Sequence, residues 1–155
     1  MAKSEKKTTP AKKTSPKVDA SAVLERIIGE AQTVYKKINA KQKPTMKLPI
    51  RALSNVKYKA SVGHFQLAGK SKIRTLTVST VRTFAQTLKM LSMSKVLVGT
   101  GRSSTKREAY YQAYNWGEVA FGTQEESDTV MDDIEAMLGV NREQLHFRAA
   151  EHGGS

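Results

Sequence analysis

Cysteine is absent from the 155-residue sequence, and so is any long apolar run. The first absence excludes a disulfide framework, a zinc–thiolate site and a thiol nucleophile. The second excludes a membrane-spanning helix, which needs about 20 mostly apolar residues. It also leaves the lysine-rich N-terminus without the apolar stretch of a secretory signal. Together these absences favour an intracellular, cytoplasmic protein with no membrane partner.

Acidic residues are missing from a long central stretch. Residues 36–107 contain seventeen Lys or Arg and no Asp or Glu, whereas residues 108–151 contain ten acids and only Arg142 and Arg148. The formal net charge of the whole chain is +12. Because uncompensated like charges within a folded region repel one another, this stretch indicates a polyanionic partner. The phosphates of DNA or RNA are the obvious candidates.

The spacing of apolar residues in the first half predicts a helix followed by a small sheet. Residues 1–18 are rich in Lys, Thr, Ser and Pro, with too few apolar side chains to fold, and are predicted to form a disordered basic tail. A helix is predicted from Ala22, after a cap at Ser21, and the proline-containing segment 41–49 is predicted to be a connector. Short strands are predicted at 56–58, 64–67 and 74–78. The apolar stripe of the helix is expected in the core and comprises Leu24, Ile27, Ile28, Ala31, Val34, Tyr35 and Ile38.

Three closely spaced helices are predicted in the second half. The first runs over about 80–98 and is ended by Gly99 and Gly101. The second begins at a capping box formed by Thr105 and Glu108 and ends near Asn115, and the third runs from an equivalent box at residues 123–126 to Gly139. With short strands expected from Leu145 onward, this is the layout of a winged-helix domain. The fold class is thus α+β, mainly helical, divided into a tail (1–18), a helix with a small sheet (19–78), a winged-helix domain (79–152) and a linker (153–155).

Two adjacent tyrosines in the second of these helices are expected to point in different directions. On an α-helix Tyr110 shares a face with Ala113 and Tyr114, whereas Tyr111 lies one turn beyond Arg107. Tyr110 is therefore expected to pack. A nearby guanidinium can favour a phenolate and stabilise charge on an attacked phosphate, so the pair Arg107 and Tyr111 has the groups needed to attack a phosphodiester. By itself this spacing is a weak signal of catalysis, and an ordinary surface face of a helix is the better interpretation of it.

Several separated blocks resemble the A subunit of DNA topoisomerase VI, of the type IIB family that includes the meiotic double-strand-break protein. The resemblance covers roughly residues 22–152, and its blocks lie at 50–56, 84–88, 104–111 (STKREAYY), 124–128 and 132–143. It implies a winged helix of the catabolite-activator type, in which Tyr111 forms a 5′-phosphotyrosyl bond with DNA and Arg107 assists. It also implies a homodimer of A subunits joined to ATP-binding B subunits as a heterotetramer, which passes one duplex through a transient double-strand break.

The resemblance stops short of the second half of that protein, which is a Toprim domain whose acidic residues hold Mg²⁺. The Toprim domain is therefore expected to be absent from this chain, which would be a fragment or split product and inactive alone. No metal site is assigned, because the acids at 128–135 are typical of a solvated helix face. The cations expected to hold the phosphates of double-stranded DNA are Lys47, Arg51, Arg74, Arg82 and Lys106.

Two other classes of protein remain open. A non-enzymatic winged-helix DNA-binding module would keep the scaffold without the reaction, and only the Arg107 and Tyr111 pair argues against it, since binding alone does not require that pair. A basic RNA-binding protein of ribosomal type is disfavoured by the acidic last third and by the lack of a motif of stacking aromatics.

Overall fold

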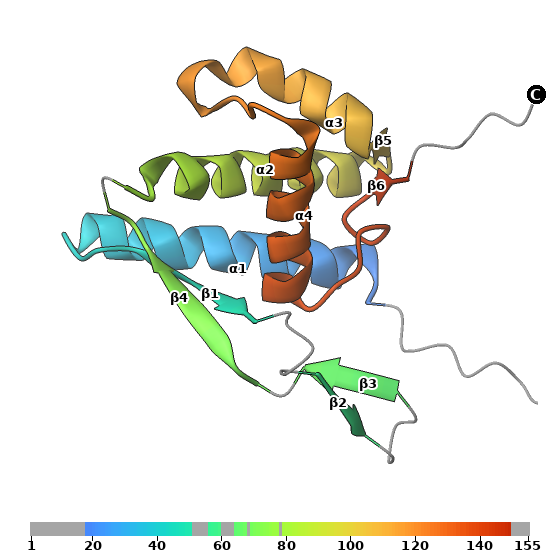
Figure 1. The fold of residues 1–155 in the computed structure, drawn as a ribbon, viewed down its shortest axis with the longest axis horizontal. Coiled ribbons are helices and arrows are strands. Elements are labelled where there is room, and N and C mark those ends of the chain that lie inside the picture. The colour runs from blue at the N-terminus through green and yellow to red at the C-terminus, as the bar shows by residue number, and fades with distance from the viewer. Residues whose placement is uncertain (1–17, 51–55, 60–63, 68, 78, 150–155) are drawn as a thin grey trace, which may run out of the picture.

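The computed structural model describes residues 18–50, 56–59, 64–67, 69–77 and 79–149. These residues form four α-helices, one 3₁₀ helix and three two-stranded sheets (Figure 1), so the predicted α+β, mainly helical class is confirmed. Nearly all of the predicted basic tail, and Arg51, lie outside the described residues.

Helix α1 (Ala20–Asn39) starts two residues earlier than predicted, because its cap is Asp19 rather than Ser21. The Asp19 carboxylate accepts a hydrogen bond of 2.8 Å from the Ala22 N–H. An aspartate at this position satisfies one of the free N–H groups of the first turn, as a serine would.

The prediction that the whole apolar stripe of α1 is core is wrong. Val23, Ile27 and Val34 are buried. In contrast, Ile28, Tyr35 and Ile38 are 37%, 65% and 51% exposed. Other elements cover only part of the apolar face of α1. The uncovered part, which includes Ile28 and Tyr35, faces solvent beside α2.

The segment predicted as a connector contains a strand. Strand β1 (Thr45–Pro49) pairs antiparallel with β4 (Ser71–Thr75). Met46 and Leu48 are each 1% exposed while Lys47 points outward, which is the alternation of a half-buried strand. The flanking prolines obscured this short pattern. The predicted strands near 56 and 64 are confirmed as β2 (Val56–Lys59) and β3 (His64–Leu67), which form a separate antiparallel pair.

Glycines end two of the three later helices. Helix α2 (Val81–Thr100) ends at Gly101, whose φ is +67°, and α4 (Gln124–Leu138) ends at Gly139, whose φ is +64°. Both adopt the left-handed conformation that glycine takes without steric cost. Gly99 does not stop α2 but lies inside it. Between these helices, α3 (Lys106–Ala113) continues as the 3₁₀ helix η2 (Tyr114–Val119).

Two strands were expected to follow Leu145, but in the described residues only one strand there is paired, and its partner comes from before α3. There, β6 (Phe147–Arg148) pairs in parallel with β5 (Ser104–Thr105), which immediately precedes α3. The pairing joins the end of the described chain to the start of α3.

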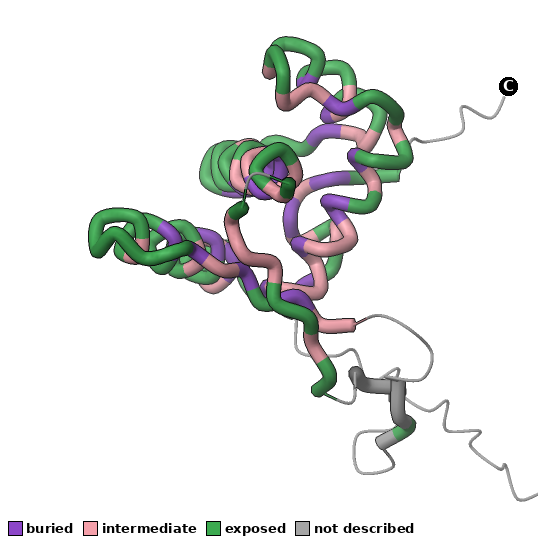
Figure 2. Tube along the Cα trace, turned by 60° about the vertical axis from the view of Figure 1, so that its left-hand side comes forward, coloured by how far each residue is buried: buried purple, intermediate pink, exposed green. Residues whose placement is uncertain are grey.

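The main core lies where α1, α2 and α4 meet, with buried segments on their facing sides (Figure 2). Val23 and Ile27 of α1 belong to the same apolar cluster as Met90 and Leu91 of α2 and Ile134 of α4. Helix α3 lies on the opposite side of α2 from α1 (Figure 1). Its fully buried residues, Ala109 and Ala113, belong to the same cluster. None of the helices in the described ranges combines the length and the apolar character that crossing a bilayer requires.

Candidate active site

Helix α3 begins with the predicted capping box. The Glu108 N–H donates to the Thr105 hydroxyl (3.1 Å), and the Thr105 N–H donates to the Glu108 carboxylate (2.7 Å). The Thr105 N–H and then the Thr105 hydroxyl hold the pKa of the Glu108 carboxyl below its ordinary value. These two bonds define the start of the helix, which in turn sets the directions of Arg107 and Tyr111.

Tyr111 faces solvent with a guanidinium group against its hydroxyl. The Arg107 Nε–H donates a hydrogen bond of 3.0 Å to the Tyr111 hydroxyl oxygen, and the guanidinium carbon lies 5.8 Å from the centre of the Tyr111 ring. Tyr111 is 47% exposed, whereas Ala109 and Ala113, on the opposite face of α3, are fully buried. The one-turn spacing predicted from the sequence thus brings a phenol and a cation together at the surface.

Tyr110 has a different environment. It is half-buried and packs against the main core, which confirms the expected difference between the two tyrosines. The hydroxyl groups of Tyr110 and Tyr114 form a hydrogen bond of 2.8 Å. This hydrogen bond, followed by partial burial and by the charges of Tyr114, Tyr111 and Glu126, raises the pKa of the Tyr110 hydroxyl above its ordinary value. Tyr110 is therefore a poorer source of a phenolate than an ordinary tyrosine.

Tyr114 was predicted only to share a helix face with Tyr110, but its ring also contacts that of Tyr111. Its ring centre lies 4.9 Å from that of Tyr110 and 5.9 Å from that of Tyr111, stacked on the latter at an interplanar angle of 30°. Both spacings, four and three residues, bring side chains together on a helix, so the signal was present in the sequence.

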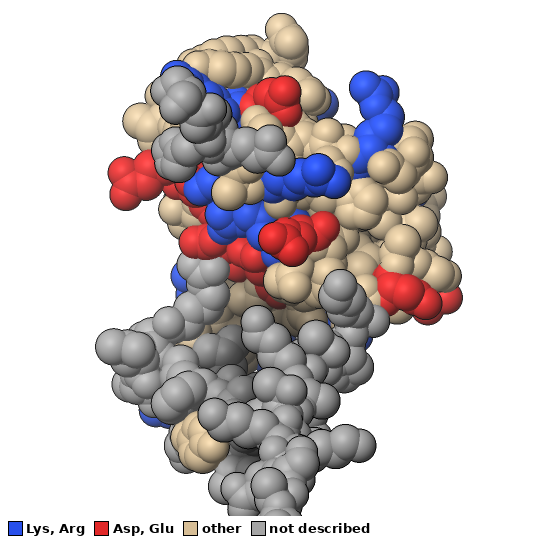
Figure 3. Space-filling view, turned by 90° about the vertical axis from the view of Figure 1, so that its right-hand side faces the viewer, with Lys and Arg blue, Asp and Glu red and all other residues tan. Residues whose placement is uncertain are grey.

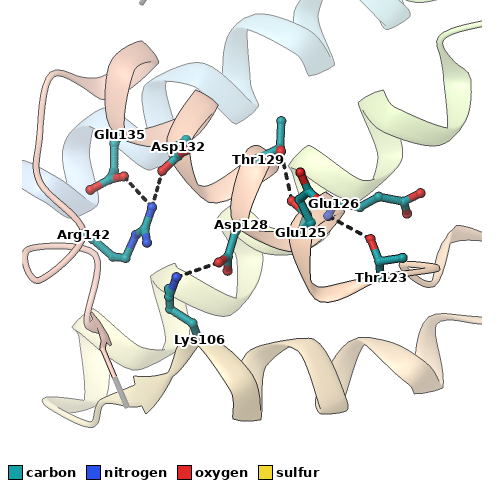
Figure 4. Close-up of polar contacts among 9 residues, drawn as sticks. All are labelled: Lys106, Thr123, Glu125, Glu126, Asp128, Thr129, Asp132, Glu135 and Arg142. Atoms are coloured by element: carbon teal, nitrogen blue, oxygen red, sulfur yellow. Dashed lines mark hydrogen bonds and ion pairs between the residues drawn. The ribbon is translucent and has the colours of Figure 1, made fainter. Parts of the chain in front are cut away.

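Three of the five nominated DNA-binding cations form ion pairs with acids of α4. Lys106 Nζ lies 2.6 Å from the Asp128 carboxylate (Figure 4). Arg74 reaches Asp133 at 3.0 Å, and Arg82 reaches Glu126 at 3.8 Å and the Ala120 carbonyl at 2.7 Å. Of the remaining two, Lys47 is exposed on β1, and Arg51 is outside the described residues.

A further cation, Arg142, binds the same helix. Its guanidinium contacts the carboxylates of Asp132 and Glu135, the latter at 3.1 Å (Figure 4). Burial raises the pKa of the Glu135 carboxyl, and the Arg142 charge opposes that rise. Basic and acidic side chains accordingly lie next to one another on the face shown in Figure 3. These pairs, which join distant segments, were not predicted from the sequence.

The described residues contain no group of three or more His, Asp or Glu side chains placed to hold a metal ion. The α4 carboxylates that could serve as ligands are instead engaged by Lys106, Arg74 and Arg142. The described carboxylates of α4 are therefore not arranged as a Mg²⁺ site.

Comparison with known proteins gives one consistent result. Residues 82–147, which contain the tyrosine site, match the family model of type IIB DNA topoisomerase. The A subunit of type 2 DNA topoisomerase 6 from Methanocaldococcus jannaschii is 46% identical over 131 residues, covering 84% of this chain and 36% of the relative. The corresponding protein of Pyrococcus abyssi is 33% identical over 140 residues (87% and 37%), and that of Methanothermobacter thermautotrophicus is 34% identical over 113 residues (72% and 32%).

The chain thus spans about a third of the length of these relatives, 36% in the first case. Within that third, the similarity extends over most of the chain, and the segment matched by the family model includes both Arg107 and Tyr111. The protein therefore belongs to the type IIB DNA topoisomerase family, in which it corresponds to part of the A subunit.

Proposed function

We propose that this chain is the DNA-cleaving part of the A subunit of a type IIB topoisomerase and that Tyr111 is its nucleophile. The observation that carries the proposal is the exposed Tyr111 hydroxyl held at 3.0 Å by the Arg107 guanidinium on a capped helix. Family membership supports a DNA substrate, and the basic stretch at 36–107 supports contacts with phosphates.

The proposed step is a transesterification. The Tyr111 oxygen attacks a backbone phosphorus as its proton passes to solvent, forming a phosphotyrosyl bond to the 5′ end of the break. The P–O3′ bond breaks, and the departing 3′ oxygen takes up a proton to become a hydroxyl. Because one phosphoester replaces another, the reverse attack reseals the strand. Cleavage of both strands by two A subunits would open a duplex for passage of a second one, allowing relaxation and decatenation.

We propose that Arg107 stabilises the negative charge that develops during the reaction. Its guanidinium already contacts the Tyr111 oxygen, so it can stabilise the phenolate that forms and the extra negative charge on the attacked phosphate. Interactions that strengthen as charge develops lower the barrier more than they tighten binding. Tyr110, which packs on the core, serves as support for the helix.

We infer the remaining requirements from the family. Residues 79–152 would act as a winged-helix domain, for which the order α2, β5, α3, α4 and β6 of the described part is suitable. The Toprim half of a complete A subunit would supply the Mg²⁺ site, and the B subunit would hold ATP. The proposed assembly is a homodimer of A subunits joined to B subunits, acting inside the cell on double-stranded DNA.

Reconstitution of the complete enzyme tests the nucleophile. The chain would be joined to the remaining part of a relative's A subunit and mixed with the B subunit, Mg²⁺, ATP and DNA, and covalent adducts would be measured on a denaturing gel. Tyr111→Phe removes only the hydroxyl and should abolish adducts while leaving DNA binding intact. Arg107→Ala should lower the cleavage rate about 10²–10³-fold, as expected for loss of one charge-stabilising donor.

Tyr110→Phe is the matched control and should reduce adducts far less. Adducts that persist in Tyr111→Phe but vanish in Tyr110→Phe would reverse our assignment of the two tyrosines. If the reconstituted enzyme binds DNA without any adduct, while an intact relative forms adducts in the same assay, the non-enzymatic DNA-binding module becomes the better description.

A further inference from the structure

Helix α4 is unsuited to the role of a DNA-reading helix. In a helix-turn-helix arrangement the last helix of the three enters the major groove. Here it carries six acids and no Lys or Arg, at positions 125, 126, 128, 132, 133 and 135. Such a helix would repel phosphates. The ion pairs with Arg74, Lys106 and Arg142 also hold α4 against the rest of the protein.

A groove on another side of the molecule has the opposite character. It lies between α2 and the α3–η2 segment, has a volume of about 450 Å³, and has polar and apolar surface in similar amounts. Its walls include Lys89, Ser92 and Val96 of α2, Arg102 just beyond α2, Gln112 of α3 and Trp116 of η2. No acidic side chain lines it.

The two cations of this groove are available to a ligand. Lys89 and Arg102 are both exposed, and within the described part of the chain neither side chain takes part in an ion pair. Helix α2 itself contains no Asp or Glu. Eleven residue steps along α2 separate Lys89 from Thr100, a rise of about 16 Å, which equals the axial rise of about five base pairs of DNA.

The groove runs beside the helix that carries Tyr111. Each residue turns an α-helix by about 100°, so Gln112, in the groove wall, flanks Tyr111 on one side. Arg107 lies about 40° to the other side of Tyr111. A strand lying in the groove would therefore run along the side of α3 adjacent to the face that carries Tyr111, with Arg107 beyond Tyr111.

We propose that the α2–α3 groove holds the sugar–phosphate backbone of one strand of duplex DNA, with Lys89 and Arg102 binding phosphates. This inference rests on the proposed function and replaces α4, as well as Arg74, Arg82 and Lys106, as the main DNA contact near the nucleophile. Gln112 and Ser92 add hydrogen-bond donors that suit phosphate oxygens. Val96, which is 60% exposed, and Trp116 give the sugars an apolar surface.

Trp116 provides a reporter for this groove, because it is the single tryptophan of the chain. Duplex DNA would be titrated into the 155-residue protein at several salt concentrations, with binding followed by anisotropy of labelled DNA. In parallel, the emission of Trp116 and its quenching by acrylamide would be recorded. DNA seated in the groove should change the emission and protect Trp116 from acrylamide.

A pair of matched charge variants locates the contact. The double variant Lys89→Gln/Arg102→Gln removes two groove cations and should weaken duplex binding on the order of tenfold at low salt, lowering the slope of log affinity against log salt by about 2. Lys36→Gln/Lys41→Gln removes the same charge from exposed residues outside the groove and should have a much smaller effect. Circular dichroism melting would confirm that both variants fold.

The outcomes separate the groove from the proposed function. If the wild-type chain binds duplex DNA but Trp116 stays accessible and the two double variants bind equally, the groove assignment is overturned while the proposed function stands. If the wild-type chain shows no salt-dependent DNA binding, the proposed function loses its electrostatic premise and the inference that rests on it falls too. Quenching of Trp116 by single-stranded DNA with none by duplex would overturn the duplex assignment, because it indicates base stacking.

Discussion

Tyr110 and Tyr111 are neighbours in sequence and share no role in the structure. The half-buried ring of Tyr110 packs on the core and its hydroxyl is bound by Tyr114, whereas Tyr111 faces solvent beside Arg107. A turn of about 100° between successive residues produces this difference. Of the two tyrosines, the one that contributes less to packing is the one that we propose as the nucleophile.

The Tyr114 hydroxyl should control the acidity of Tyr110. The hydrogen bond between them is the largest cause of the raised pKa of Tyr110, so Tyr114→Phe should bring that pKa back toward its ordinary value. Titration of the tyrosine ring carbons by NMR from neutral to alkaline pH would measure it. Tyr35→Phe, which removes an exposed hydroxyl on α1, is the control and should leave Tyr110 unchanged. An unchanged Tyr110 titration in Tyr114→Phe would contradict this cause.

At the scale of elements, the caps of α3 and α4 differ although their sequences look alike. Both Thr105 and Thr123 accept a hydrogen bond from the N–H three residues later. Glu108 completes its box on Thr105, whereas the Glu126 carboxylate accepts from the Gly122 N–H, one residue further back, at 2.9 Å. The predicted second capping box is therefore only half formed, and Glu126 is also drawn toward Arg82.

The kink between α3 and α4 depends on Gly117. Its φ of +62° and ψ of −130° are inaccessible to a side-chain-bearing residue without strain, so Gly117→Ala should destabilise the fold by about 1–3 kcal/mol. Gly99→Ala is the matched control: Gly99 lies in α2, and a methyl group there meets no atom within 4 Å. That change should stabilise the fold by about 0.5–1 kcal/mol. Urea unfolding measures both, and equal effects would contradict the conformational argument.

At the scale of the whole molecule, the acidic and basic halves of the chain neutralise each other in part. Arg74 and Lys106 come from the acid-free stretch, and both bind carboxylates of α4 that lie 59 and 22 residues away. These partly buried pairs contribute modestly to stability, because the cost of removing the charges from water offsets much of their attraction. Their larger consequence is to engage cations that could otherwise bind DNA, whereas Lys89 and Arg102 of the α2–α3 groove take part in no ion pair within the described part of the chain.

The basic tail is expected to contribute to binding without contributing to stability. Deleting residues 1–18 should leave the melting temperature nearly unchanged, because the segment has few apolar side chains to bury. DNA binding should weaken and become less sensitive to salt, because six lysines are lost. Calorimetry and salt-dependent titrations measure the two effects, and a tail of the same length with Gln in place of Lys is the control. A large fall in melting temperature would show that the tail packs.

The sequence by itself determined the features that depend on near neighbours. The capping box of α3, the glycine ends of α2 and α4, and the contact of Arg107 with Tyr111 all join residues three to five positions apart. Helix geometry brings such residues together whatever surrounds them. The contact of Arg107 with Tyr111 and the packing of Tyr110 were therefore predictable from spacing, whereas the candidate role of Tyr111 came from the family resemblance.

Only the tertiary structure decided which side chains from distant segments meet. It placed β1 in a segment whose two prolines suggested a connector, left Ile28, Tyr35 and Ile38 of α1 exposed, and paired Arg74, Arg82 and Lys106 with acids. It also formed the groove between α2 and α3. The pattern of charges along a chain shows that cations and acids are present, but packing determines their separation in space, and electrostatic interaction depends on that separation.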